Sequence, residues 1–215
     1  MKNPIFITGC PRSGAGLIAR IVKLCGAEGG NLNSVYENVD IKYHVFTPCM
    51  EKRNTQYPLP NVHDILIPVN IKGKTEELIN SNDKAWFIKG SELALLYPVF
   101  NYAFPNAKWI IVRRRTGDII QSCLKTAYMD AFEDEKIRIK INVDTEIEGW
   151  KWWVHQYEDR FVSMIQKGLN CKVIYPDRME VGDYQQIEET IEWLGLTWNN
   201  EVLSIMPNLI KTERK

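Results

Sequence analysis

A short glycine-rich stretch near the N-terminus has the residue types of an anion-binding loop. The stretch is FITGCPRSGAGL, residues 6 to 17, in which an apolar run ends at Gly9 and Gly14 precedes a helical pattern of apolar residues. This order predicts a strand, a tight loop and a helix. Backbone N–H groups at such a helix start attract an anion, and Arg12 inside the loop adds a forked donor for phosphate or sulfuryl oxygens. The stretch therefore predicts an anion site in this loop.

The loop departs from the common nucleotide-triphosphate loop, G-x-x-x-x-G-K-[ST]. The spacing from Gly9 to Gly14 fits the first part of that motif, but Ala15 and Gly16 stand where the Lys and the Ser or Thr are needed. A nucleotide or small-molecule kinase on the same kind of sheet remains an alternative. The missing Lys and magnesium-binding hydroxyl count against it.

A second basic stretch, WIIVRRRTGDIIQS, follows a later apolar run. Three arginines, Arg113 to Arg115, leave this predicted strand, and Ser122 lies in the helix that follows. Arg114 precedes Ser122 by eight residues, so a loop and one to two helical turns could bring the guanidinium and the hydroxyl onto the same phosphate. The other interpretation of the three arginines is a solvated basic edge.

The elements that would position these groups alternate along the chain. Three further segments have the β-branched or aromatic composition of buried strands: KAWFIKG, AKWIIVRR and CKVIYPD. Helical patterns lie between and after them, at Leu93 to Ala103, Asp118 to Ala131, Thr145 to Gly168 and in DYQQIEETIEWLGL. This alternation predicts an α/β fold with three layers, in which helices flank a central, mostly parallel sheet. Ligands bind at the carboxyl ends of such strands, where both basic stretches begin.

Composition favours one globular domain over the whole chain. The 215 residues are 45% hydrophobic and 25% charged, and no linker or repeat divides them, so we expect a single domain at 1–215 with a substrate-facing insertion at about 33–80. The 27 basic and 27 acidic side chains balance, which gives no reason to expect nucleic acid as a partner. The chain shows neither a signal-peptide pattern nor an apolar run long enough for membrane insertion, so we expect a cytoplasmic protein.

Two other groups of residues, an aromatic series and the cysteines, have types that could do chemistry. Trp150, Trp153, Tyr157, Phe161 and Ile165 recur at helical spacing, which favours a core-facing stripe over a ligand-binding one. The five cysteines lack zinc or disulfide spacing and are expected to be buried thiols. A thiol at a helix N-terminus can have a lowered pKa, so Cys10 is the one candidate for reactivity.

Both basic stretches resemble the sulfotransferases that use 3′-phosphoadenosine 5′-phosphosulfate (PAPS). Pro11, Arg12, Ser13 and Gly14 match the family's P-[KR]-S-G-T-[TS] loop, and the second stretch matches its R-x-P-x-D-x-x-x-S segment. The second match consists of Arg114, Asp118 and Ser122. Further likenesses lie in SVYENVDIKYHVF, in WFIKGSELALLYPVFNYAFPNAKWIIVRR and in VIYPDRM with the final helix, so the resemblance covers most of the chain.

The resemblance implies a P-loop nucleotide-kinase-like sulfotransferase fold and a specific donor site. The loop would hold the 5′-phosphosulfate without a metal, through Gly9, Cys10, Pro11, Arg12, Ser13, Gly14, Ala15 and Gly16. Arg12 would also steady the negative charge that develops on the leaving phosphate. Arg114 and Ser122 would bind the 3′-phosphate, and Tyr175 would complete the donor contacts. The product would be adenosine 3′,5′-bisphosphate, and the acceptor a small molecule or glycan with a hydroxyl or amine.

Two side chains are candidates for the general base that activates the acceptor. The family's K-T-H-x-P motif has no counterpart here, because the chain reads Lys89, Gly90, Ser91. Glu37 is the first candidate, since its loop could fold over the donor's sulfate end, and His44 is the reserve. Lys89 is expected to contact the donor or the transferred sulfuryl group. The alternatives are a surface Glu that caps or pairs, and a solvated Lys at a strand end.

Two departures from the family keep a third function open. Ala15 and Gly16 replace two hydroxyl residues, and the basic Arg-Lys-Gly loop that many members carry near the C-terminus has no counterpart. Each lost hydrogen bond to a charged group costs on the order of 1 to 3 kcal/mol. A non-catalytic nucleotide-binding relative is therefore the second alternative.

Overall fold

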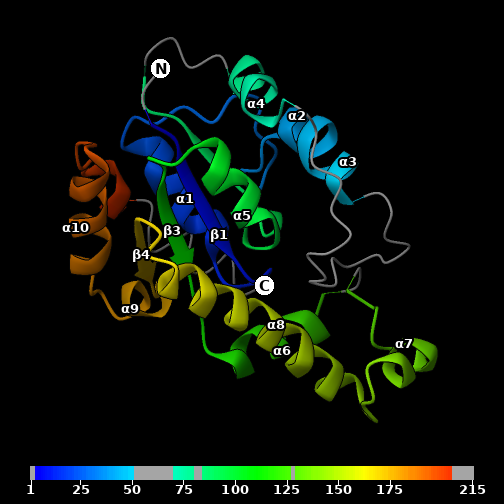
Figure 1. Ribbon diagram of the computed structural model, residues 1–215. Helices are drawn as coiled ribbons and strands as arrows, with labels where there is room; N and C mark the ends of the chain where they lie inside the picture. Colours follow the sequence, from blue (N-terminus) through cyan, green and yellow to red (C-terminus); the bar gives the residue numbers. More distant parts are fainter. Residues whose placement is uncertain (1–2, 51–69, 80–83, 127–128, 205–215) are drawn as a thin grey trace.

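A four-stranded parallel sheet forms the centre of the computed structural model, which describes residues 3–50, 70–79, 84–126 and 129–204 (Figure 1). The strands lie in the order β2-β1-β3-β4, and every neighbouring pair is parallel. Their bounds are Ile5–Gly9 for β1, Phe87–Lys89 for β2, Lys108–Val112 for β3 and Cys171–Ile174 for β4. The predicted parallel sheet is confirmed: β2, β3 and β4 each lie within the segment that predicted them, and β1 begins one residue before the quoted stretch.

Helices cover both faces of this sheet (Figure 1). One face is covered by α1 (Ala15–Leu24), α9 (Pro176–Glu180) and α10 (Gln185–Leu194). The other face is covered by α5 (Glu92–Ala103), α6 (Thr116–Leu124) and α8 (Glu146–Gln166). The structure therefore has the three layers that the alternation of strands and helices predicted.

The side chains of each strand point alternately to the two faces of the sheet, and the hydrophobic core is therefore divided in two. In β1, Phe6 packs into the core on the α5 and α8 side, whereas Ile5 and Ile7 pack against α1 and α10. In β3, Trp109 faces the first core and Ile110 the second. Successive strand side chains point to opposite faces, so a strand that is apolar throughout is buried on both sides.

The aromatic stripe of α8 is mainly a core feature, as predicted. Trp150, Trp153, Tyr157 and Phe161 are buried, and neighbouring rings in this series lie 5.2 to 6.3 Å apart. The prediction is wrong for Ile165, which is 45% exposed. Met164 is buried in its place, because the helical repeat of 3.6 residues brings position 164 onto the buried face after Phe161.

Two helical segments differ from the expected pattern. The helix predicted at Asp118 to Ala131 ends at Leu124. Near that end the Thr126 hydroxyl donates to the Ser122 carbonyl at 2.7 Å, a side-chain bond that competes with continuation of a helix. The short helix α7 (Glu135–Lys140) was not predicted.

The expected insertion is helical where it is described. It contains α2 (Val39–Ile41), the π-helical turn η1 (Lys42–Phe46), α3 (Thr47–Met50) and α4 (Ile71–Ile79). Residues 51–69, where three prolines predicted little regular structure, lie outside the described residues. In Figure 1, α2, α3 and α4 lie together beyond α5, at one edge of the molecule.

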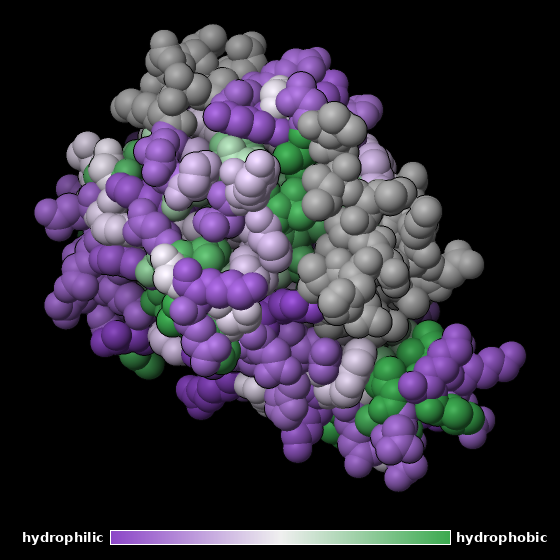
Figure 2. Space-filling model, viewed as in Figure 1, coloured by the Kyte–Doolittle hydropathy of each residue, from purple (hydrophilic) through white to green (hydrophobic). Residues whose placement is uncertain are grey.

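Most of the face in Figure 2 is hydrophilic, and apolar groups show over α7 at the lower right, where Ile139 is exposed, beside the grey residues at the upper centre and in smaller areas at the left. In the described part of the chain, no helix has the length and apolar composition needed to cross a bilayer.

Candidate functional site

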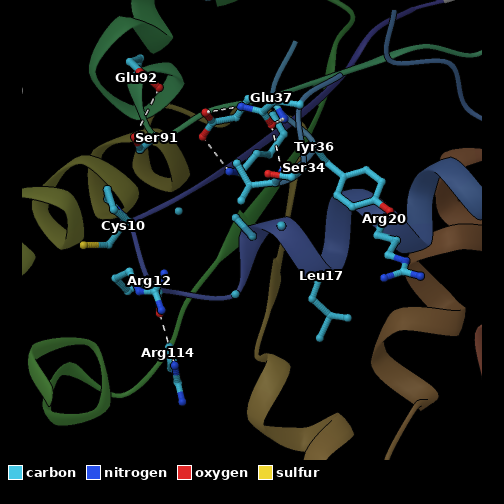
Figure 3. A pocket seen from close by; sticks show the side chains of 18 of the residues that line it. Cys10, Arg12, Leu17, Arg20, Ser34, Tyr36, Glu37, Ser91, Glu92 and Arg114 are labelled. Carbon is cyan, nitrogen blue, oxygen red and sulfur yellow. Dashed lines mark hydrogen bonds and ion pairs between the residues drawn. The ribbon is translucent and has the colours of Figure 1, made fainter. Parts of the chain in front are cut away.

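A cavity opens at the carboxyl ends of β1, β2 and β3. Its volume is about 640 Å³, within the range of about 300 to 1,000 Å³ usual for small-molecule sites. Most of its wall comes from the loop after β1 with the start of α1, from the turn at 33–37, from residues that follow β2, and from Arg114 after β3 (Figure 3). Loops and helix N-termini converge at this edge of a parallel sheet, which makes it the expected place for a ligand.

The loop after β1 contributes free backbone donors to this wall. Gly14, Ala15 and Gly16 line the cavity, and within the described residues their N–H groups have no hydrogen-bond acceptor. These groups belong to the N-cap and first turn of α1, where the helix itself supplies no acceptor. Gly14 has φ 89°, a conformation that glycine adopts without a steric penalty. The predicted anion-binding geometry is therefore present in the backbone.

Gly9, at the end of β1, and Ser13 lie close together beneath the loop. A Cβ on Gly9 would lie 2.4 Å from the Ser13 Oγ and 2.7 Å from the Val112 carbonyl oxygen of β3, so only glycine fits there. Ser13 is buried and lies outside the cavity lining, and its hydroxyl has no hydrogen-bond partner among the described residues. The structure therefore places Ser13 under the loop, away from the cavity where the resemblance would have it contact a donor.

The two predicted basic stretches meet at the side of the cavity. Arg12 Nε donates to the Ser122 Oγ at 2.8 Å, and Arg114 Nη1 donates to the Arg12 carbonyl at 3.4 Å (Figure 3). Arg114 is mostly buried, and its Nε lies 3.5 Å from a carboxylate oxygen of Asp177 in α9. Asp177 also lies 3.6 Å from the exposed Arg115. Folding thus brings together Arg12, Arg114 and Ser122, which the sequence separates by up to 110 residues.

Glu37 is held at the cavity wall by a tight turn and two lysines. The Asn33 side-chain oxygen accepts hydrogen bonds from the Val35 and Glu37 N–H groups, at 3.0 and 2.9 Å. The Glu37 carboxylate then pairs with Lys89 at 2.8 Å and with Lys42 at 3.2 Å. Both candidates from the sequence, Glu37 and Lys89, therefore line the same cavity and contact each other.

The two lysines set the charge of this carboxyl. Burial by itself would raise the pKa of Glu37, but Lys89 and then Lys42 outweigh burial and lower the pKa below its ordinary value of 4.5. Glu37 is consequently ionised at neutral pH.

This lowered pKa predicts a pH-dependent contribution to stability. A carboxyl whose pKa is lower in the folded state stabilises the fold above the unfolded-state value, and that contribution is lost as the pH falls through the folded-state pKa. We therefore expect the difference in free energy of unfolding between the wild type and Glu37→Gln to be constant near neutral pH and to shrink below about 4.5. Urea unfolding across that range measures it.

A surface pair provides the control for this measurement. Glu28 pairs with Lys84 at 2.9 Å, but both side chains are largely exposed, so solvent screens their attraction. Glu28→Gln should therefore change the pH dependence less than Glu37→Gln does. A Glu37→Gln difference that stays constant on acidification would contradict the assignment of the lowered pKa to the lysine contacts.

Cys10 has the opposite character from that of a reactive thiol. It lines the cavity but is only 2% exposed. Burial, followed by the nearby Cys123 and Glu158, raises the pKa of Cys10 well above its ordinary value of 9.0. Desolvation by burial thus counts against a lowered pKa and a reactive thiol at Cys10. The prediction of buried free thiols holds for Cys25, Cys49 and Cys123 as well, whereas Cys171 is half-buried.

Besides Ser13 and Ser122, two further predicted site residues lie outside the cavity lining. His44 is exposed on the π-helical turn, and Tyr175, at the start of α9, is 40% exposed. The Tyr175 hydroxyl accepts a hydrogen bond from Arg113 at 3.4 Å, and the Arg113 guanidinium lies 6.0 Å from the ring centre. In this structure Tyr175 thus contacts Arg113, which also pairs with Glu158 of α8.

Several lining residues were missed by the sequence analysis. Arg20 lies one helical turn after Gly16, and that spacing alone places both on one face of α1. Glu92 and Ser91 follow β2 directly, and the position after a parallel strand was a usable signal. No pattern in the sequence indicates that Tyr36 lines the cavity. Its position depends on a φ of 63° in the turn that the Asn33 side chain closes.

Comparisons with solved structures identify proteins of similar fold. A sulfotransferase of Mycobacterium tuberculosis H37Rv, STF1, matches 96% of this chain and 71% of its own with a TM-score of 0.56 and 16% identity. STF9 of Mycobacterium avium matches 100% and 69% with a TM-score of 0.53 and 11% identity. A sulfotransferase of Alicyclobacillus acidocaldarius matches 99% of this chain and 93% of its own, with a TM-score of 0.55 and 12% identity.

These likenesses confirm the predicted sulfotransferase fold. No family model matches the sequence, and no curated protein matches it. Within the described residues, no group of three or more His, Cys, Asp or Glu side chains is placed to hold a metal ion.

Proposed function

We propose that this protein is a sulfotransferase that moves a sulfuryl group from PAPS to a hydroxyl or amine of a small-molecule or glycan acceptor. One observation carries the proposal: a single cavity, in a fold shared with sulfotransferases, joins the free amides of the α1 N-terminus to the Arg12, Arg114 and Ser122 cluster. Two separate places for anionic groups suit a nucleotide that carries phosphates on both sides of its ribose.

The residues present fit such a donor. The amides of Gly14, Ala15 and Gly16 would hold the 5′-phosphate, since Ala15 and Gly16 offer no hydroxyl of their own. Arg114 and Ser122 would hold the 3′-phosphate. The volume of about 640 Å³ has room for a nucleotide and part of an acceptor.

Charge at the opposite wall suits proton transfer from an acceptor. When bound, the donor supplies the sulfuryl group that the acceptor takes. Glu37 is ionised at neutral pH and could accept the proton that the acceptor hydroxyl loses. Lys89, at 2.8 Å from Glu37, would orient this carboxylate and place positive charge in the cavity. The turn at 33–37 and the start of α5 would shape the acceptor's end of the site.

Ligand-dependent thermal stability tests the proposal. We expect adenosine 3′,5′-bisphosphate to raise the melting temperature, since a ligand at about 100 times its Kd adds about 2.7 kcal/mol to the free energy of unfolding. ATP with magnesium should have a smaller effect. Incubation with PAPS and a panel of phenols, amines and sugars should then release adenosine 3′,5′-bisphosphate. Chromatography of the reaction mixture detects this product.

Each alternative function gives a different result. Stabilisation by adenosine 3′,5′-bisphosphate without transfer to any acceptor would favour a non-catalytic relative, which the Ala15 and Gly16 departures allow. Stabilisation by ATP with magnesium alone would contradict the proposal in favour of a kinase.

A further inference from the structure

Arg12 is directed toward the second basic stretch. Its Nε donates to the Ser122 Oγ at 2.8 Å, and in Figure 3 its side chain lies on the same side of the loop as Arg114. Among the described residues, Arg12 forms no ion pair. With Nε engaged by Ser122, the two terminal nitrogens of the guanidinium fork remain for an anion.

The backbone of Arg12 supports this placement. Its φ is 70°, in the left-handed region that a residue with a Cβ rarely occupies. Arg114 donates to the Arg12 carbonyl at 3.4 Å and so ties the strained residue to the end of β3. Strain of this kind gathers at binding sites, where surrounding contacts hold it in place.

Arg114 is positioned for the same anion. Its Nε faces Asp177 at 3.5 Å, and Asp177 is also shared with Arg115. The Nε is buried and has no hydrogen-bond partner within the described residues, so this part of Arg114 is available for a bound anion. Two guanidinium groups and one hydroxyl therefore converge beside the cavity, with one carboxylate to offset their charge.

We infer that Arg12 binds the 3′-phosphate of the nucleotide, together with Arg114 and Ser122, and leaves the 5′-phosphate to the amides of the α1 N-terminus. This inference rests on the proposed function. It changes the expected role of Arg12, which the resemblance places at the leaving phosphate. It also supplies a second cation for the 3′-phosphate in a chain without the Arg-Lys-Gly loop.

A pair of nucleotides that differ only in the 3′-phosphate tests the inference. Calorimetric titration would compare adenosine 3′,5′-bisphosphate with adenosine 5′-phosphate, each against the wild type, Arg12→Ala and Arg12→Lys. Arg12→Ala should weaken the bisphosphate by roughly 10- to 100-fold, as expected for lost hydrogen bonds to a charged group, and the monophosphate by less than about threefold. Arg12→Lys keeps the charge but lacks the fork, so its effect on the bisphosphate should be intermediate.

Arg20→Ala is the matched control. It removes the same charge from the same cavity, but Figure 3 places Arg20 beside Tyr36, away from Arg114. For Arg20→Ala, the ratio of the affinity for adenosine 3′,5′-bisphosphate to that for adenosine 5′-phosphate should therefore equal the wild-type ratio. Circular dichroism checks that every variant is folded, and Arg12→Lys replaces Arg12→Ala if the latter is not.

The outcomes separate this inference from the proposed function. If the wild type prefers the bisphosphate but the Arg12 variants weaken both nucleotides by the same factor, the inference is wrong and the proposed function stands. If the wild type shows no preference for the bisphosphate, the proposed function fails and the inference fails with it.

Discussion

Glu37→Gln should lower the rate of sulfuryl transfer by about a hundredfold or more, the usual effect of losing a general base. The amide is nearly the same size as the carboxylate but cannot take up a proton. The affinity for adenosine 3′,5′-bisphosphate should change by no more than about twofold, because Glu37 lies at the wall opposite the Arg12 and Arg114 cluster (Figure 3). Steady-state kinetics for turnover and calorimetry for affinity measure the two effects separately.

Glu92→Gln is the matched control for this experiment. Glu92 is the other carboxylate of the cavity lining, and its described contact is with the Ser91 hydroxyl at 3.3 Å. This variant should transfer sulfuryl at close to the wild-type rate. If Glu92→Gln loses activity while Glu37→Gln keeps it, the base is Glu92. If neither variant loses activity, solvent or His44 takes the proton.

Arg114→Ala should weaken adenosine 3′,5′-bisphosphate by roughly 10- to 100-fold, in proportion to the loss of hydrogen bonds between charged groups. Adenosine 5′-phosphate lacks the 3′-phosphate and should bind the variant within about threefold of the wild type. Calorimetric titration of both nucleotides measures the ratio. Equal weakening of the two would remove Arg114 from the 3′-phosphate site.

Arg115→Ala controls for the loss of one positive charge at this strand end. Arg115 is the next residue, its side chain is 80% exposed, and it also contacts Asp177. Exposed charges are screened by solvent, so this variant should bind both nucleotides nearly as the wild type does. A large effect of Arg115→Ala would mean that general positive charge at the end of β3, rather than a direct contact by Arg114, controls affinity.

Patterns of apolar residues and glycines predicted most strands and helices, because these elements depend on residues close together in the sequence. The strand, loop and helix at residues 5–24 follow from an apolar run, from glycines and from helical spacing of apolar residues. The same logic located β3 and the helices α5, α8 and α10 to within a few residues. One prediction failed at the end of α6, where the Thr126 hydroxyl donates to the Ser122 carbonyl near the last helical residue.

The sequence by itself determined which groups are available for chemistry. Glycine spacing and the end of an apolar run are enough to predict free amides at a helix start. The order of arginines and Ser122 after a strand is enough to suggest a phosphate contact. These features depend on neighbours within a few residues, and the chain carries them whatever its tertiary fold.

Only the tertiary structure decided which of these groups meet. Arg12 reaches Ser122, and Glu37 reaches Lys89, because the order β2-β1-β3-β4 places β2 and β3 on either side of β1. Burial likewise raised the pKa of Cys10, and the two lysines lowered that of Glu37. Such effects depend on distance and desolvation across segments far apart in the chain, which no local pattern encodes.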